Sequence, residues 1–179
     1  MKSVLISIQP KWCELIASGQ KTVEVRKTKP KLEPPFKTYI YCTQGLFQDL
    51  GVIGNEMYQK RMKVIGEFVC DDIAKILNFV THFGVEGRPE RELNTIARSS
   101  CLDYMDMLEY LGTDKDGYAW HISDLKIYDH PKKLSEFRRG CPDSVRSCAM
   151  CKHGDYTGMK CTPITRPPQS WCYVEDGGE

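Results

Sequence analysis

Short apolar runs, separated by polar stretches rich in glycine or proline, extend along most of the chain. Residues 4–8 form a short β-rich run that predicts a strand, and residues 22–26 alternate between apolar and polar side chains, which is typical of a half-buried strand. Residues 44–61 are polar and contain glycine, so we expect a loop there. Further strands are predicted at residues 39–43, 64–70, 118–128 and 170–174. Short strands in this order favour a small curled or closed sheet over parallel βαβ units.

Helical spacing is confined to two parts of the chain. Pro10 suits the first turn of a helix whose apolar residues share one face and which Gly19 ends. A helical insertion at about residues 78–112 has apolar residues three and four positions apart, and Ser100 with Asp103 forms a capping-box pattern within it. The chain therefore combines a predicted sheet with one early helix and one helical insertion.

Length and composition agree with one globular domain. The 179 residues are 41% hydrophobic and 27% charged, which argues against a disordered, coiled-coil or collagen-like chain. No apolar run approaches the roughly 18 residues that a membrane span requires, and the first ten residues lack the features of a secretion signal. We expect a single domain over residues 1–179 of mainly β (α+β) class, without a membrane partner.

The formal net charge of +1 conceals an uneven distribution of charge along the chain. Residues 1–40 and 126–166 each carry a net charge of +5, whereas residues 41–125 carry −6 and the tail carries −3. If the two basic segments lie together, they form a positive face suited to phosphate. If they are scattered, their side chains are ordinary solvated surface.

The cysteine content indicates the compartment and a candidate metal site. Nine cysteines, an odd number, together with the lack of a signal peptide, favour the reducing cytoplasm over disulfide bonding. Four of them lie within residues 141–161, where the average frequency in this chain predicts about one.

These four cysteines have the spacing of a structural zinc site. Cys148 and Cys151 form a C-x-x-C step, and Cys141 and Cys161 complete four thiolates, which leave no open position on a tetrahedral ion. His153 or Cys172 is the possible substitute ligand. We expect a zinc-stabilised, cysteine-rich knuckle at about residues 138–166, with a redox C-x-x-C or free thiols as the alternatives.

The opening of the chain resembles a known family. In SIQPKWCELIASGQKTVEVRK, the residues Gly19, Lys21, Glu24 and Arg26 have the spacing G-x-K-x-x-E-x-R, which resembles the signature of the ASCH domain. The later stretches YIYCT, KVIGEF, AWHISDLKIYD and PQSWCYVED are similar to segments of bacterial and phage members, in the same order. The resemblance implies a small PUA-like β-barrel, to which the early helix, the helical insertion and the zinc-knuckle-like C-terminal appendage are added. It also implies RNA or nucleotide binding.

The motif residues have a chemistry of their own. Glu24 and Arg26 point the same way from a strand and can form a charged hydrogen-bonded pair, which leaves Lys21 as a mobile cation at the mouth of a cleft. The carboxylate then accepts from amide or base N–H groups, and the two cations donate to phosphate or carbonyl oxygens. We expect these three residues to bind RNA or a nucleotide. In the alternative, Glu24 and Arg26 only close the barrel and Lys21 is solvated.

Aromatic side chains on the predicted elements are candidates for stacking on a base. We choose Trp171, which follows a proline-rich segment in the last strand, and expect most of the others to be core: Trp12, Tyr39, Tyr41 and Trp120. We likewise expect His121 to line the core or the barrel.

An enzyme is the main alternative function. One branch of the family is similar to an amidohydrolase that removes the acyl group from acetylcytidine, using a lysine, a hydroxyl residue within the motif and a distant carboxylate. This chain has Glu24 where the resemblance puts the threonine, and a carboxylate beside Lys21 favours the ammonium over the neutral amine that a nucleophile requires. If the protein is an amidohydrolase or a nuclease, Lys21 and Glu24 are the catalytic candidates, with a second carboxylate from Glu67, Asp71 or Asp72. A third alternative is a protein-interaction module that uses the acidic insertion.

Overall fold

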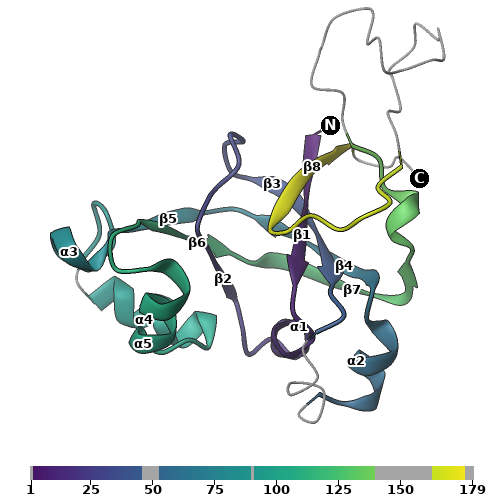
Figure 1. Ribbon diagram of the computed structural model, residues 1–179, viewed down its shortest axis with the longest axis horizontal. Coiled ribbons are helices and arrows are strands. Elements are labelled where there is room, and N and C mark those ends of the chain that lie inside the picture. The colour runs from purple at the N-terminus through teal and green to yellow at the C-terminus, as the bar shows by residue number, and fades with distance from the viewer. Residues whose placement is uncertain (1, 46–52, 90, 140–162, 176–179) are drawn as a thin grey trace, which may run out of the picture. The chain divides into compact units, whose positions relative to one another are not determined.

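The computed structural model describes residues 2–45, 53–89, 91–139 and 163–175 (Figure 1). The chain divides into two compact units, each assembled from segments that are separated in sequence. Residues 1–11, 38–67 and 127–179 form the first unit, and residues 12–37 and 68–126 form the second. None of the described helices is long and apolar enough to cross a membrane.

Strands and helices follow one another in a mixed order along the described chain. In sequence they are β1 (Lys2–Ile8), α1 (Pro10–Ala17), β2 (Val23–Arg26), β3 (Phe36–Cys42), α2 (Asn55–Lys60), β4 (Lys63–Cys70), β5 (Ile73–Ile76), α3 (Phe79–His82), α4 (Arg91–Ser100), α5 (Tyr104–Leu111), β6 (Gly117–His121), β7 (Ser123–Lys132), the 3-10 helix η2 (Leu134–Glu136) and β8 (Trp171–Glu175).

The first unit holds most of a five-stranded sheet with the strand order β7-β4-β3-β1-β8. Strand β1 is parallel to β3 and antiparallel to β8, so that the C-terminal strand forms one edge of the sheet (Figure 1). The core of this unit is a cluster of buried apolar side chains, namely Leu5, Tyr39, Tyr41, Val64, Tyr128, Phe137, Ile164 and Val174.

The second unit contains a three-stranded antiparallel sheet with the order β2-β6-β5. Alternate residues of paired strands share a face, so the register assigns each side chain to one side of this sheet. One face carries Val23, Val25, Ala74 and Ala119, which form a buried cluster with apolar residues of α4 and α5. The opposite face carries two rows of neighbours, Glu24–Trp120–Ile73 and Arg26–Tyr118–Lys75. The motif strand therefore presents its polar residues away from the helical insertion's core.

Several predicted elements are confirmed. The strands expected at residues 4–8, 22–26, 39–43, 64–70 and 170–174 are observed as β1, β2, β3, β4 and β8, with bounds that differ from the expected ones by three residues or fewer. Gly19 ends α1 with a φ of 75°, a conformation in which glycine has no steric cost, as the sequence predicts. The mixed α+β class, mostly sheet, is also as expected.

Other predictions are wrong. The strand expected at residues 118–128 is two strands, β6 and β7, which belong to different sheets. The described strands thus form two sheets and no closed barrel. The sequence did not predict this, because a continuous β-rich run does not reveal where the chain changes sheets.

Two further predictions about single segments also differ from the structure. Strand β2 is buried along its whole length rather than half buried. The expected loop at residues 44–61 contains helix α2, and the predicted knuckle falls almost entirely on residues 140–162, outside the described residues.

The capping box also lies three residues further along than predicted. Asp103 is the N-cap of α5, where its side chain accepts from the Asp106 amide at 2.7 Å and the Asp106 carboxylate accepts from the Asp103 amide. Ser100 instead ends α4, and its carbonyl oxygen accepts a hydrogen bond from the Lys21 ammonium.

Candidate functional site

The motif residues come together at the start of β2 in the second unit. The Glu24 carboxylate lies between two cations, with Lys21 Nζ 3.3 Å from Oε2 and an Arg26 guanidinium nitrogen 2.9 Å from Oε1. The side chain of Lys21 is 2% exposed, and those of Glu24 and Arg26 are each 8% exposed. Two positive charges and one negative charge are therefore held in one nearly buried network.

Lys21 is fixed at both ends rather than mobile. Its backbone amide donates to the Leu15 carbonyl, which follows from the sharp exit of the chain from α1 at Gly19. Its ammonium donates to the Ser100 carbonyl oxygen at 2.6 Å and lies 5.1 Å from the centre of the Trp12 ring. The expectation of a mobile cation at the mouth of a cleft is wrong, because α4 packs on β2 and brings the end of this helix to the ammonium.

Arg26 extends the network to the helical insertion. Its side chain forms a hydrogen bond with the hydroxyl of Tyr110 on α5. Burial raises the pKa of this tyrosine, and the nearby guanidinium acts in the opposite direction. Tyr110 remains partly exposed, so the network reaches the surface at an aromatic ring.

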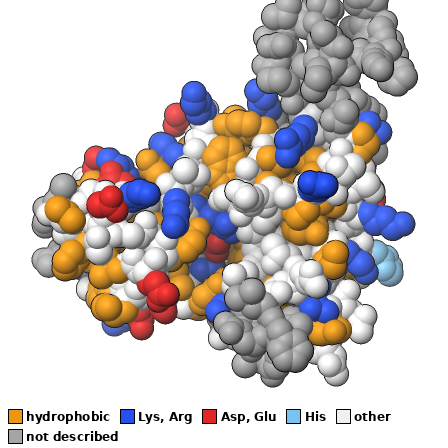
Figure 2. Space-filling view, in the orientation of Figure 1, with side chains coloured by type: hydrophobic (Ala, Val, Ile, Leu, Met, Phe, Trp, Pro, Cys, Tyr) orange, Lys and Arg blue, Asp and Glu red, His pale blue; other side chains and the backbone are white. Residues whose placement is uncertain are grey.

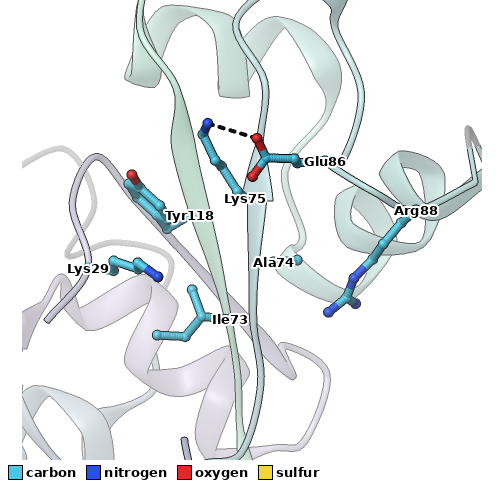
Figure 3. Close-up of a pocket in the computed structure, with 7 residues that line it drawn as sticks. All are labelled: Lys29, Ile73, Ala74, Lys75, Glu86, Arg88 and Tyr118. Atoms are coloured by element: carbon cyan, nitrogen blue, oxygen red, sulfur yellow. Dashed lines mark hydrogen bonds and ion pairs between the residues drawn. The ribbon is translucent and has the colours of Figure 1, made fainter. Parts of the chain in front are cut away.

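A pocket of about 310 Å³ lies on the same unit but not around the motif residues. It is lined by Lys29, Ile73, Ala74, Lys75, Glu86, Arg88 and Tyr118 (Figure 3). Lys75 forms ion pairs with Glu86 at 3.1 Å and with Asp116 at 3.2 Å, and these carboxylates raise the pKa of the lysine. The ammonium of this lysine is thus already neutralised within the protein.

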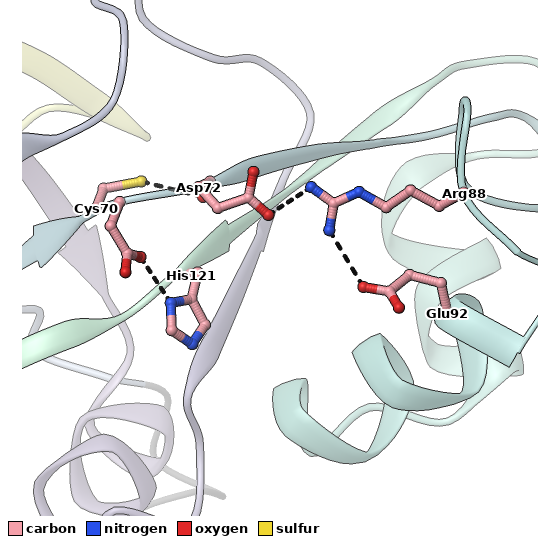
Figure 4. Close-up of polar contacts among 6 residues, drawn as sticks. Cys70, Asp72, Arg88, Glu92 and His121 are labelled. Atoms are coloured by element: carbon pink, nitrogen blue, oxygen red, sulfur yellow. Dashed lines mark hydrogen bonds and ion pairs between the residues drawn. The ribbon is translucent and has the colours of Figure 1, made fainter.

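Two acidic residues after β4 have basic partners that the sequence did not predict (Figure 4). Asp71 Oδ1 lies 2.6 Å from Nδ1 of His121, and this hydrogen bond lowers the pKa of the carboxyl. Asp72 pairs with Arg88, which also contacts Glu92 at 3.2 Å. The histidine side chain is 46% exposed, so the expectation that it lines a core is wrong. Because the pair spans 50 positions in sequence, no local pattern indicated it.

The other candidates lie in different surroundings. Trp171 belongs to the first unit, where its ring packs edge-to-face on Tyr173 with centroids 5.4 Å apart. Glu67, the third candidate for a second carboxylate, accepts from the Tyr128 hydroxyl at 2.5 Å. Tyr39, Tyr41 and Trp120 are core residues, as expected, whereas Trp12 is half buried beside Lys21. The nucleotide-binding role of the motif residues and of Trp171 stays a prediction.

The proposed zinc ligands Cys141, Cys148, Cys151 and Cys161, with the substitute His153, lie outside the described residues. Within the part of the chain that the structure describes, no three or more histidine, cysteine or acidic side chains gather in a way that could hold a metal ion. Cys172, the other substitute ligand, is a free thiol in β8, and burial raises its pKa.

The family and the fold have known relatives. Residues 6–94, about half of the chain, match the family model of the ASCH domain. The crystal structure of ASCH from Zymomonas mobilis has a similar fold, with a TM-score of 0.58 and 18% identity over 97% of this chain and 87% of that chain. A serine-to-alanine variant of ZmASCH gives a TM-score of 0.59 at 18% identity, covering 97% and 88% of the two chains.

A tyrosine-to-phenylalanine variant of ZmASCH gives a TM-score of 0.51 at 20% identity, covering 75% of this chain and 77% of that chain. No curated protein matches the chain by sequence. ASCH domains are PUA-like modules that in general bind RNA. With the motif network, the family match and the shared fold in agreement, this chain belongs to the ASCH domain family.

Proposed function

We propose that this protein binds RNA or a nucleotide at the surface built around Lys21, Glu24 and Arg26. The observation that carries the proposal is the single network that joins these residues and ends at two partly exposed aromatic rings, Trp12 and Tyr110. Base–aromatic stacking and a positive charge nearby are the two components of most nucleic-acid sites that do not read a fixed sequence.

The buried network contributes charge and rigidity rather than direct contacts. Its formal charge is +1, and because the three groups are nearly buried, this charge is screened less by water and salt than a surface lysine. The hydrogen bonds to Ser100 and Tyr110 fix the side chains before a ligand arrives. A phosphate close to either ring therefore meets a preorganised positive field.

Binding of a fluorescently labelled RNA tests the proposal. We expect affinity to fall linearly in a plot of log K against log salt concentration. Trp12→Leu and Arg26→Gln weaken binding because they remove a stacking ring and a network cation. Arg98→Gln is the matched control, since Arg98 is an exposed cation on α4 outside the network.

Thermal unfolding of each variant separates loss of binding from loss of the fold, because Arg26→Gln leaves Glu24 with one cation fewer in a buried site. Trp12→Leu removes no charge and provides the independent measurement. Equal RNA affinity of the wild type and of a folded Trp12→Leu protein, or no RNA or nucleotide binding by the wild type, would contradict the proposal.

The amidohydrolase or nuclease alternative has less support. The Lys21 ammonium lies 3.3 Å from a carboxylate and donates to a carbonyl oxygen, an arrangement that suits a charged structural lysine more than a nucleophile. Turnover of acetylcytidine or cleavage of RNA by the purified protein, abolished in Lys21→Met, would favour the enzyme.

An exposed apolar surface favours protein interaction as a second candidate function. Phe79, Val80, Tyr104 and Met105 of α3 and α5 are exposed, and Phe83 packs edge-to-face on both Phe79 and Tyr104. Hydrophobic side chains appear between acidic and basic ones over these helices (Figure 2). Binding to a protein partner through this surface would survive high salt, whereas phosphate-driven binding would not.

We also propose a structural zinc ion held by Cys141, Cys148, Cys151 and Cys161. The support is the C-x-x-C step and the local density of cysteines in the sequence. Metal analysis of the purified protein should give one zinc per chain, reduced by Cys148→Ser.

A further inference from the structure

Beyond Arg26, the chain carries two further pairs of a lysine and a tyrosine in the second unit. Lys27 Nζ lies 5.2 Å from the centre of the Tyr110 ring, and Lys29 Nζ lies 5.9 Å from the centre of the Tyr118 ring. We name Lys27, Lys29, Tyr110 and Tyr118 the lysine–tyrosine strip. Both lysines are exposed, and neither forms an ion pair among the described residues.

Arg26 links the two tyrosines. It hydrogen-bonds to Tyr110 through its side chain, and in the sheet register it is the direct cross-strand neighbour of Tyr118. Side chains of directly opposed residues project from the same face of a sheet at close spacing. The strip therefore begins at the motif network and continues from α5 to β6.

The pocket described above defines the far end of the strip. Lys29, Tyr118 and Ile73 lie together along one side of β5, whereas Arg88 lies on the other side (Figure 3). Arg88 is bound by Asp72 and Glu92, and Lys75 is bound by Glu86 and Asp116. Of the three cations that line the pocket, Lys29 is the one that no described carboxylate binds, and Lys27 lies two residues before it in the chain.

From this geometry we propose that the strip binds single-stranded RNA of at least two nucleotides, with unpaired bases on Tyr110 and Tyr118 and the intervening backbone on Lys27 and Lys29. The proposal rests on the proposed function and names its ligand class. The paired bases of a duplex do not offer their faces to a side chain, so stacking on two rings selects single strands.

The lysines do not obstruct the rings. An exposed cation–π contact changes an equilibrium by roughly 2- to 5-fold, whereas stacking of a base on an aromatic ring changes it by roughly 5- to 150-fold. A base therefore displaces a lysine from the ring. The released ammonium, on a flexible stem, is then close to the phosphate of the same nucleotide.

Fluorescence anisotropy with the full chain tests this assignment. The probes are a labelled single-stranded RNA decamer of mixed sequence, the same decamer annealed to its complement, and unlabelled AMP and UMP as competitors. We expect the single strand to bind at least about tenfold more tightly than the duplex or either mononucleotide, because only it occupies both rings and both lysines.

Single substitutions test whether each residue of the lysine–tyrosine strip contacts the RNA. Tyr110→Leu and Tyr118→Leu each weaken binding of the decamer by roughly 5- to 150-fold, and Tyr118→Phe, which keeps the ring, leaves it unchanged. Lys27→Gln and Lys29→Gln each reduce the salt slope by roughly 0.7. The matched control for the ring is Tyr104→Leu, since Tyr104 and Tyr110 are both 38% exposed on α5, and the control for charge is Lys126→Gln.

The outcomes are distinct. If the wild type binds no RNA or nucleotide, the proposed function fails and the strip fails with it. If the decamer binds and Trp12→Leu weakens it, but folded Tyr110→Leu and Tyr118→Leu proteins bind as the wild type does, only the strip is overturned. Equal affinity for single strand, duplex and mononucleotide also overturns it and leaves RNA binding at the motif network.

Discussion

Cys70 and Cys101 differ in environment, and the structure shows how burial controls the chemistry of a thiol. Cys70 is fully buried at the end of β4, and its Sγ donates to the Asp72 carbonyl oxygen at 3.5 Å. Burial, with a smaller contribution from the Asp71 carboxylate, raises the pKa of this thiol to about 12. Cys101 follows α4 and is partly exposed.

We predict that iodoacetamide at pH 8 modifies Cys101 but not Cys70 in the folded protein. The thiolate is the reacting form, and with a pKa of about 12 roughly one Cys70 in 10,000 is ionised at this pH. Peptide mapping by mass spectrometry measures the modification of each cysteine, and the denatured chain is the control in which both react. Equal modification of both residues in the folded protein would contradict the burial of the Cys70 side chain.

The helices of the insertion show which features of an element can be predicted from local sequence. Apolar spacing predicted both α4 and α5, but Ser100–Asp103 and Asp103–Asp106 fit the capping-box spacing equally well. Which of the two pairs forms the capping box depends on where α4 ends. Ser100 is the last residue of that helix, and its carbonyl oxygen accepts a hydrogen bond from Lys21, 79 positions earlier. The motif spacing brought Lys21, Glu24 and Arg26 to one site, but their burial depends on these long-range contacts and could not be predicted.

Replacement of Asp103 tests the observed N-cap of α5. Asp103→Ala removes the acceptor of the Asp106 amide hydrogen bond, and we expect a loss of about 1 kcal/mol in the free energy of unfolding. Urea unfolding followed by circular dichroism measures the loss. Glu109→Ala is the control, because Glu109 is exposed on the same helix and has no part in its cap. A loss no larger than that of the control would exclude the capping box.

At the scale of the whole molecule, neither compact unit is continuous in sequence. The first unit uses three segments and the second uses two. The family match, by contrast, covers the continuous residues 6–94 and ends within α4. The end of the family match does not coincide with the end of a structural unit. Strands β2 and β5 lie within the match, but β6, which lies between them in the sheet, begins at Gly117.

We predict that a fragment of residues 6–94 does not fold, although it contains the complete motif. Without β6, strands β2 and β5 lose their shared partner, and Val23, Val25 and Ala74 lose the cluster that α5 and β6 complete. Exposed backbone groups and apolar side chains of this kind lead to aggregation. Thermal unfolding should show a cooperative transition for residues 1–179 and none for the fragment. A cooperative transition in residues 6–94 would mean that the motif strand has another partner, and that the sheet register from which the lysine–tyrosine strip is inferred does not hold.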